Sequence, residues 1–183
     1  MSSSDRSARR TSFANRRQIL AGIGGFLGVG ALSACGFSPA YGPKGGAQVL
    51  THQVLSDAPT NKFAFDLVTQ LDARFGRPQN ARFGLSYDIK LKRSGVAITT
   101  DNATTRYNMT GTVTWALRDL ATEKELTKGS VRNFTSYSAT GSTIAGFTAE
   151  LDAQTRLMNI LADQIADQLV ATASQWSGEA RVR

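Results

Sequence analysis

The sequence has one cysteine, Cys35, and one histidine, His52, in 183 residues. A disulfide requires a pair of cysteines, and a structural zinc site is built mostly from cysteine and histidine. The scarcity of both residue types argues against a disulfide framework, a zinc site and a cysteine–histidine catalytic pair. No other constellation of nucleophile, base or paired acids replaces them. We therefore predict a protein that is not an enzyme and that binds no metal and no cofactor.

The sequence also lacks an apolar run of about 20 residues, the length that a membrane-spanning helix needs. Its longest apolar run covers residues 19–32, which carry no charge and follow a segment with five arginines. A basic segment before a short apolar one is typical of a secretory signal peptide. The run ends in Leu32-Ser33-Ala34-Cys35, which has the form of a bacterial lipobox. We predict a lipoprotein signal peptide over residues 1–34 and lipidation of Cys35.

In this interpretation Cys35 carries a diacylglycerol and a fatty acyl chain such as palmitate, and residues 35–46 form a flexible tether. Buried acyl chains contribute about 0.8 kcal/mol per CH₂, so this anchor would hold the protein on a membrane. The residue after the cysteine is Gly36 rather than an aspartate, which favours the outer membrane. An uncleaved anchor helix with a buried free cysteine is the alternative. Export by the general secretory or the twin-arginine route stays open.

Negative charge is scarce before Cys35, where Asp5 stands against five arginines. From Cys35 onward, 16 lysines and arginines face 13 acidic residues. Most of the excess positive charge therefore lies in the segment that we expect to be removed. The remaining chain is only mildly basic, and we predict no nucleic-acid partner.

Apolar side chains recur at helical spacing in two segments. The first predicts a helix that ends before Gly76, with either Asp57 or Thr60 as its N-cap; its apolar residues are Phe63, Leu67, Leu71 and Phe75. The second predicts a long helix from near Ile144 to residue 173, with apolar positions at Phe147, Leu151, Met158, Leu161, Ile165 and Leu169. Residues 177–183 are expected to form a disordered tail.

Alternating apolar and polar side chains predict three strands, over residues 83–91, 107–118 and 126–137. The first of them resumes at residues 96–98 after a break. In the third, the apolar positions change phase near Gly129, where we expect a β-bulge. The short apolar stretch 48–55 is expected to form a further strand ahead of the first helix.

The predicted order is therefore β-α-β-β-β-α, in a single domain over residues 47–176. Short connections make the last three strands an antiparallel meander. Two amphipathic helices need an apolar surface to cover, and the sheet offers one such face. We predict an α+β two-layer sandwich with two helices on one face of a mostly antiparallel four-stranded sheet. The other face is rich in hydroxyl, amide and basic groups.

Several short motifs resemble the LptE family of lipopolysaccharide-assembly lipoproteins in its alphaproteobacterial form. The segment from Cys35 to Gly42, CGFSPAYG, resembles the start of the mature family members. The pattern continues, in order, through residues 105–108, 117–119, 136–138, 149–153 and 161–165. The family fold, two helices on a four-stranded sheet, agrees with the order read from periodicity.

The resemblance implies a non-enzymatic lipoprotein of Gram-negative cell-envelope biogenesis, on the periplasmic face of the outer membrane. Such proteins plug the lumen of the LptD β-barrel, assist its assembly and help deliver lipopolysaccharide to the outer leaflet. Lipopolysaccharide is anionic, so lysine and arginine are the expected contacts. The candidates for lipopolysaccharide or barrel contact are Lys90, Lys92, Arg93, Arg106, Arg118 and Arg132.

Two other functions remain as alternatives. A lipoprotein adaptor or accessory subunit of another envelope lipid-transport system would share the anchor and the size. A periplasmic hydrolase would need a cleft in which titratable groups converge.

Overall fold

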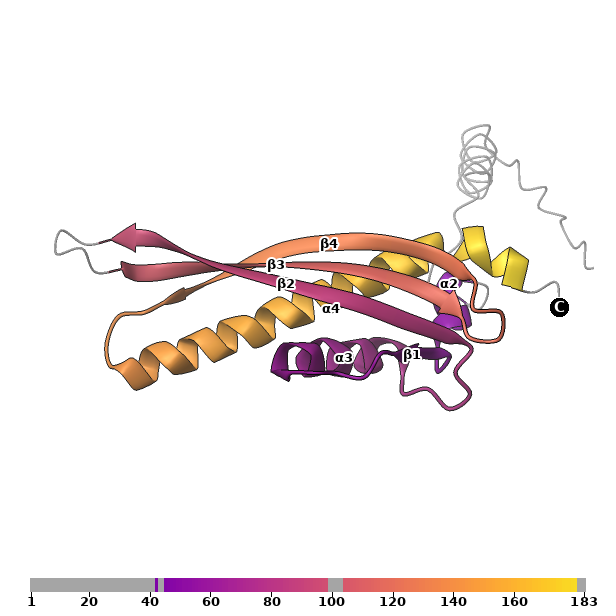
Figure 1. Ribbon diagram of the computed structural model, residues 1–183, viewed down its shortest axis with the longest axis horizontal. Helices are drawn as coiled ribbons and strands as arrows, with labels where there is room; N and C mark the ends of the chain where they lie inside the picture. Colours follow the sequence, from indigo (N-terminus) through magenta and orange to yellow (C-terminus); the bar gives the residue numbers. More distant parts are fainter. Residues whose placement is uncertain (1–41, 43–44, 99–103, 181–183) are drawn as a thin grey trace, which may run out of the picture. The chain divides into compact units, whose positions relative to one another are not determined.

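A computed structural model of the chain describes residues 42, 45–98 and 104–180 (Figure 1). The predicted signal peptide and Cys35 lie outside the described residues. The elements, in chain order, are α2 (Gly46–Leu50), β1 (Val54–Ser56), α3 (Lys62–Phe75), β2 (Phe83–Ile98), β3 (Thr104–Asp119), β4 (Glu125–Ser138) and α4 (Thr143–Ala180).

The sheet has the strand order β1-β2-β3-β4. β1 pairs with β2 in parallel over three residues, and β2, β3 and β4 form an antiparallel meander. Helices α3 and α4 lie on the same face of this sheet (Figure 1). The predicted α+β arrangement, two helices covering one face of a mostly antiparallel four-stranded sheet, is confirmed.

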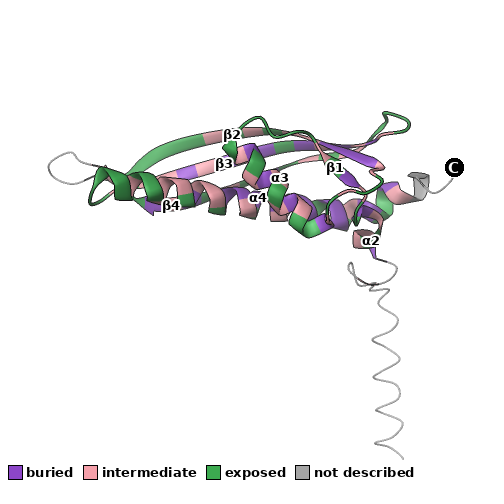
Figure 2. Cartoon of the chain, turned by 90° about the horizontal axis from the view of Figure 1, so that it is seen from below, coloured by how far each residue is buried: buried purple, intermediate pink, exposed green. Residues whose placement is uncertain are grey.

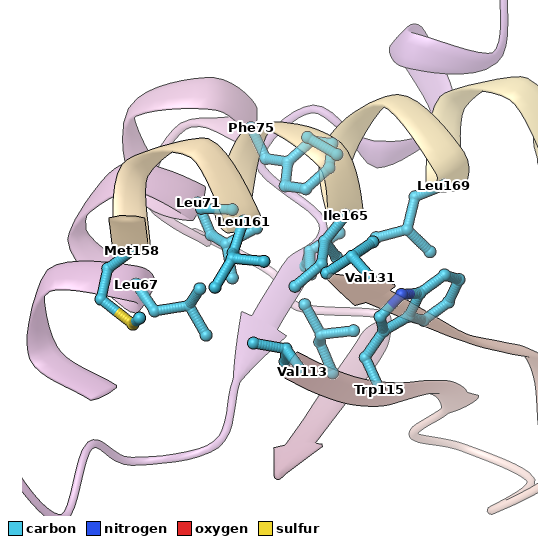
Figure 3. Close-up of a cluster of buried hydrophobic side chains, with 14 of the residues drawn as sticks. Leu67, Leu71, Phe75, Val113, Trp115, Val131, Met158, Leu161, Ile165 and Leu169 are labelled. Atoms are coloured by element: carbon cyan, nitrogen blue, oxygen red, sulfur yellow. The ribbon is translucent and has the colours of Figure 1, made fainter. Parts of the chain in front are cut away.

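The core lies between the sheet and the two long helices, and its composition follows from the two periodicities. Val113 and Trp115 of β3 are buried on the helix-facing side, as is Val131 of β4. Leu161 and Ile165 of α4 pack over them (Figure 3). Burial of each such aliphatic side chain is worth about 1.5–3 kcal/mol, and this term holds the layers together.

The stretch predicted as one strand, residues 48–55, is wrong as a single element. It contains the end of α2, a turn in which His52 has a φ of 57°, and the start of β1. The reason is tertiary: Leu50 is fully buried in the core, and Gly46 lies directly on α4. A Cβ at Gly46 would come within 2.6 Å of the Val170 carbonyl oxygen.

The N-cap of α3 is Asn61, and neither Asp57 nor Thr60 has that role. The Asn61 side-chain oxygen accepts a hydrogen bond of 2.9 Å from the Ala64 N–H. Asparagine is as good an N-cap as aspartate, so residue type alone did not discriminate among these positions.

The β-bulge of the third meander strand occurs at Leu126 and not at Gly129. Leu117 pairs with Thr127 and Arg118 pairs with Glu125, so Leu126 is the extra residue. Gly129 sits in regular register opposite Trp115, whose ring atom Cζ2 lies 2.6 Å from the position of a Cβ at Gly129. The glycine makes room for an indole ring and leaves the register unchanged.

β2 has no break before residues 96–98, and β3, β4 and α4 are longer than predicted. β2 continues through Gly95 to Ile98, with register shifts around Ala97. α4 begins at Thr143, where the Ser142 hydroxyl accepts a bond of 3.3 Å from the Ala145 N–H, and it continues to Ala180. Residues 177–180, predicted as disordered tail, are therefore helical.

Candidate functional site

The candidate site is the sheet face on which none of the described helices lies, and we call it the outer face. It consists of the even-numbered side chains of residues 84–94 in β2, 106–118 in β3 and 128–138 in β4. Alternation along each strand places these side chains opposite the core. Its centre is a row of hydroxyl and amide groups on β3: Asn108, Thr110, Thr112 and Thr114.

Strand register brings four of the six predicted cations to this face. Lys90 and Arg132 flank Thr112 from either side, because both residues pair with it. Two strand spacings separate their backbones by about 10 Å. Lys92 is the neighbour of Thr110. Arg106 is opposite Ser138, toward the end of the meander strands.

The outer face has few carboxylates to neutralise these cations. The Lys90 Nζ lies 3.8 Å from the Asp88 Oδ2. Both side chains are largely exposed, so this ion pair contributes little to stability. Within the described part of the chain, Lys92, Arg106 and Arg132 form no ion pair. The result is a hydroxyl-rich surface with exposed positive charges that an anionic ligand could approach.

Arg93, the fifth predicted cation, lies on the opposite side of the sheet, where it joins β2 to α4. Its Nη1 donates to the Glu150 carboxylate at 3.2 Å and to the Tyr137 hydroxyl at 3.5 Å. The guanidinium also lies 5.0 Å from the centre of the Tyr107 ring. The hydrogen bond to Tyr137 and the charge of Glu150 raise the pKa of Arg93 above its ordinary value. These contacts indicate a structural role for Arg93 in holding α4 on the sheet.

Arg118 is on the outer face but far along it, and acidic groups already surround it. Its Nη2 is 3.6 Å from Asp57 and its Nε is 3.7 Å from Glu123. The second distance is too long for a hydrogen bond, and the buried Nε has no hydrogen-bond partner. Arg118 is therefore not an exposed positive charge like the other four.

The chain is similar to known proteins in sequence and in structure. The family model described as LptE, lipopolysaccharide-assembly, matches residues 52–169. The chain belongs to the LptE family. Membership assigns the chain to lipopolysaccharide assembly. Because this family is non-enzymatic, the prediction that the chain is not an enzyme is confirmed. Among curated proteins, a search found no match.

Solved structures confirm the LptE-type fold. A lipoprotein structure from Caulobacter crescentus has a TM-score of 0.59 at 20% identity and covers 70% of this chain and 96% of its own. Rare lipoprotein B from Shewanella oneidensis has a TM-score of 0.51 at 14% identity, covering 67% and 96%. A minor lipoprotein from Acinetobacter baumannii has a TM-score of 0.50 at 18% identity, covering 66% and 90%.

In this LptE-family chain, His52 has a structural environment. It lies in the turn between α2 and β1, where its Nδ1 is 3.0 Å from the Arg77 carbonyl oxygen. Its ring packs on Gly76, which has a φ of 78°. In the part of the chain that the structure describes, no group of three histidine, cysteine or acidic side chains could hold a metal ion. No described helix is both long and apolar enough to cross a membrane.

One residue of the outer face was missed by sequence reasoning. Phe134 is 59% exposed and shares the parity of Arg132, two positions earlier on β4. It pairs with Thr110, so it lies in the same cross-strand row as Lys92. The sequence contains the information that identifies Phe134: after the change of phase in β4, even-numbered residues belong to the polar face. An aromatic side chain between cations suits a ligand that is both anionic and partly apolar.

A shallow hollow of about 310 Å³ lies farther along the outer face, toward the end of the hairpin that joins β3 and β4. Its lining includes the small residues Ser86 and Ala116 and the charged residues Asp88 and Lys128. Because the hollow carries one charge of each sign, it is less suited to an anion than the surface around Thr112.

Proposed function

We propose that this chain is an outer-membrane lipoprotein whose domain plugs the lumen of the LptD β-barrel. In that position it would assist the assembly of the barrel and help to deliver lipopolysaccharide to the outer leaflet. The lipid on Cys35 would hold it at the periplasmic face of the membrane. The proposal goes beyond family membership in naming the partner, the location and the anchor.

The observation that carries the proposal is the composition of the outer face. The lumen of an outer-membrane barrel is polar and hydrated, so a protein inside it needs a compact body with a polar, hydroxyl-rich surface. The row from Asn108 to Thr114 is such a surface, and it is ordered: the Ser136 hydroxyl donates to the Asn108 side-chain oxygen at 2.5 Å. Among the described strand residues, the large buried apolar side chains point to the helix-facing side.

The same face is our proposed contact for lipopolysaccharide. Phosphates and acidic sugars are bound by lysine and arginine through charge-assisted hydrogen bonds. Lys90 and Lys92 of β2 and Arg132 of β4 lie on either side of two threonines of β3, Thr110 and Thr112. Arg106 lies farther along β3. Arg93 and Arg118 are left out of this proposed contact because carboxylates already bind them.

The proposed anchor fits the start of the folded domain. The chain between Cys35 and Gly46 has 11 residue steps, which span at most about 40 Å when fully extended. The domain would therefore stay within about 40 Å of the bilayer. A Cys35→Ala variant should lose acylation, which mass spectrometry of the processed protein would detect, and should leave the membrane fraction. An acylated variant would contradict the lipid-anchor proposal.

The decisive experiment combines depletion with purification. Depletion of the protein should lower the amount of correctly assembled LptD and of lipopolysaccharide at the cell surface. Purification of the full-length lipoprotein from detergent-solubilised outer membrane should bring down a large β-barrel in about equal amount. Normal LptD and normal surface lipopolysaccharide after depletion would reject the proposal. Recovery of a different envelope transporter would favour an adaptor role in another lipid-transport system.

A further inference from the structure

The first turns of α4 extend beyond the helix that covers the rest of it. α3 runs parallel to α4, because residue numbers increase in the same direction along the hydrogen bonds between the two helices. These bonds join Lys62 to Thr155 at 3.4 Å, Gln70 to Asp163 at 3.0 Å and Arg74 to Asp167 at 2.7 Å. α3 therefore begins beside Thr155. α4 begins at Thr143, which is 12 residues or about 18 Å earlier. No α3 residue accompanies this part of α4 (Figure 1).

The buried side of α4, which packs on α3 and on the sheet, continues into this extension. At 100° per residue, Ile144 and Leu151 lie within about 40° of Thr155 around the helix axis, and Phe147 has the same direction as Ile165, which packs over the sheet. Farther along, the same side of α4 carries Met158 and Ala162, both fully buried. Before Thr155 the large apolar side chains on this side are exposed: Ile144 is 79% exposed and Phe147 is 62% exposed. Figure 2 shows this change as the green beginning of α4.

Ile144, Phe147 and Leu151 therefore form an apolar surface, which we call the α4 stripe. It continues the side of α4 that α3 and the sheet cover farther along, at a point where α3 is no longer present. The stripe is also uncharged: residues 143–149 include no acidic or basic residue, and the nearest carboxylate, Glu150, is bound by Arg93. Apolar and aromatic side chains with few charges are typical of the buried centre of a protein–protein interface.

The stripe is held in place before any partner arrives. The Arg93–Glu150 contact joins α4 to β2, and the Thr135 hydroxyl donates to the Ala153 carbonyl oxygen at 2.9 Å. A surface that is already ordered loses less conformational entropy on binding. Residues 143–149 contain no lysine or arginine, and the nearby Arg93 is already paired with Glu150, which is unlike a helix that binds an anionic lipid surface.

We infer that the α4 stripe is a docking surface for an apolar, uncharged polypeptide segment of the barrel protein, which would occupy the line of α3 beyond Asn61. This inference rests on the proposed function, because it names the part of the chain that the barrel contacts. It commits to a protein segment as the occupant, since α3 shows that a polypeptide fits this face of α4. A second copy of the chain and a lipid bilayer are the occupants that the experiment must separate from it.

The test uses Phe147→Asp in the full-length lipoprotein, purified from detergent-solubilised outer membrane. A carboxylate in an apolar interface should reduce co-purification of the barrel at least about tenfold, the ratio that corresponds to about 1.4 kcal/mol. Because Phe147 is exposed, the thermal midpoint of the purified variant should stay within a few degrees of the unmodified protein. A photo-crosslinking residue at position 147 should form an adduct with the barrel.

Phe65→Asp is the matched control. Phe65 is 59% exposed on the outer side of α3, near Asp72 and Arg77, so one more charge changes little there. This variant should recover the barrel within about twofold of the unmodified protein. Equal loss of the barrel in both variants would overturn the specificity of the α4 stripe.

Three results would overturn the inference itself. The first is full recovery of the barrel with Phe147→Asp. The second is a dimer of the unmodified protein, seen by sedimentation, that Phe147→Asp dissociates. The third is flotation with neutral phosphatidylcholine vesicles that depends on Phe147 in the non-acylated Cys35→Ala chain. If the unmodified protein recovers no barrel at all, the proposed function fails instead, so the two failures are distinguishable.

Discussion

The two ends of the domain have opposite chemistry. The charged end includes β1, the turn between β3 and β4, and the end of α4; there Arg82 pairs with Asp119, Arg118 with Asp57 and Lys128 with Glu125. The uncharged end includes residues 94–98, 104–105 and 138–149, which contain no acidic or basic residue; Arg106, which pairs with Ala97 and Ser138, is the cation at its border. A domain that only had to be soluble would distribute charge over both ends.

The ends also differ in how completely they are packed. At the charged end, the rings of Phe83 and Trp176 meet edge to face at 5.4 Å, and both residues are nearly fully buried. At the uncharged end, Ile144 and Phe147 are exposed on α4, and Val96 is half-exposed on β2. The charged end therefore contains a packed aromatic pair, while the uncharged end leaves two large apolar side chains of α4 exposed.

Truncation of an aromatic residue at each end tests this comparison most strongly. Phe83→Ala should lower the free energy of unfolding by about 3–5 kcal/mol, because it leaves a cavity beside Trp176. Phe147→Ala should change it by less than about 0.5 kcal/mol, because the ring contacts little in the isolated domain. Urea denaturation of both variants measures the difference. Similar losses for the two variants would contradict the division of the domain into a packed end and a binding end.

Two glycines allow the same comparison with a smaller effect. At the charged end, Gly46→Ala should destabilise the domain by about 1–3 kcal/mol, since the new methyl group meets the Val170 carbonyl oxygen and the Ala173 side chain. At the uncharged end, Gly146→Ala should stabilise it by up to about 1 kcal/mol, because alanine favours the helix. The space there is free, with a closest atom at 4.0 Å. Thermal unfolding of both variants should show midpoint shifts of opposite sign.

The charged end should also confer a pH dependence, which is the smallest of the three effects. Burial opposes the charge on Asp119, but hydrogen bonds from the backbone N–H groups of Thr122 and Ala121, together with Arg82, lower its pKa overall. A lowered pKa in the folded state means that the ionised carboxylate stabilises the fold above its unfolded pKa of about 3.9. This stability is lost as the pH falls through the folded value.

Asp119→Asn is the variant that isolates this contribution. The amide oxygen can still accept from the backbone, so the variant should keep most of its stability at neutral pH. It should lose less stability than the unmodified protein as the pH falls below about 4. Denaturation series at several pH values provide the measurement. Parallel curves of the free energy of unfolding against pH for the two proteins would show that Asp119 does not contribute to acid sensitivity.

Sequence periodicity predicted the elements that bury one face over many residues. The alternation at residues 83–91 and the four-residue spacing from Phe63 to Phe75 were correct, since each pattern reports burial by one neighbouring layer. Errors occurred where one contact decides the conformation. Leu50 enters the core from a short helix, and Gly129 accommodates the Trp115 ring without a bulge.

The candidate site was predicted in part. The lysines at 90 and 92 and the arginines at 106 and 132 lie on one face because strand parity is readable from the sequence once the phase is known. Arg93 was grouped with them although its odd number places it on the helix side. Phe147 was predicted as part of the apolar stripe of a covered helix, and helical spacing cannot show that α3 is too short to reach it.

The sequence by itself determined the order of the long elements, the split of each strand into an apolar and a polar side, and the motifs of the LptE family. These properties depend on residues close together in the chain, where backbone geometry sets the period. Only the tertiary structure decided which cations are already bound by carboxylates, where the bulge occurs and which apolar residues stay exposed. Those properties depend on how far one element extends along another, and helix length and strand register are set by contacts between distant residues.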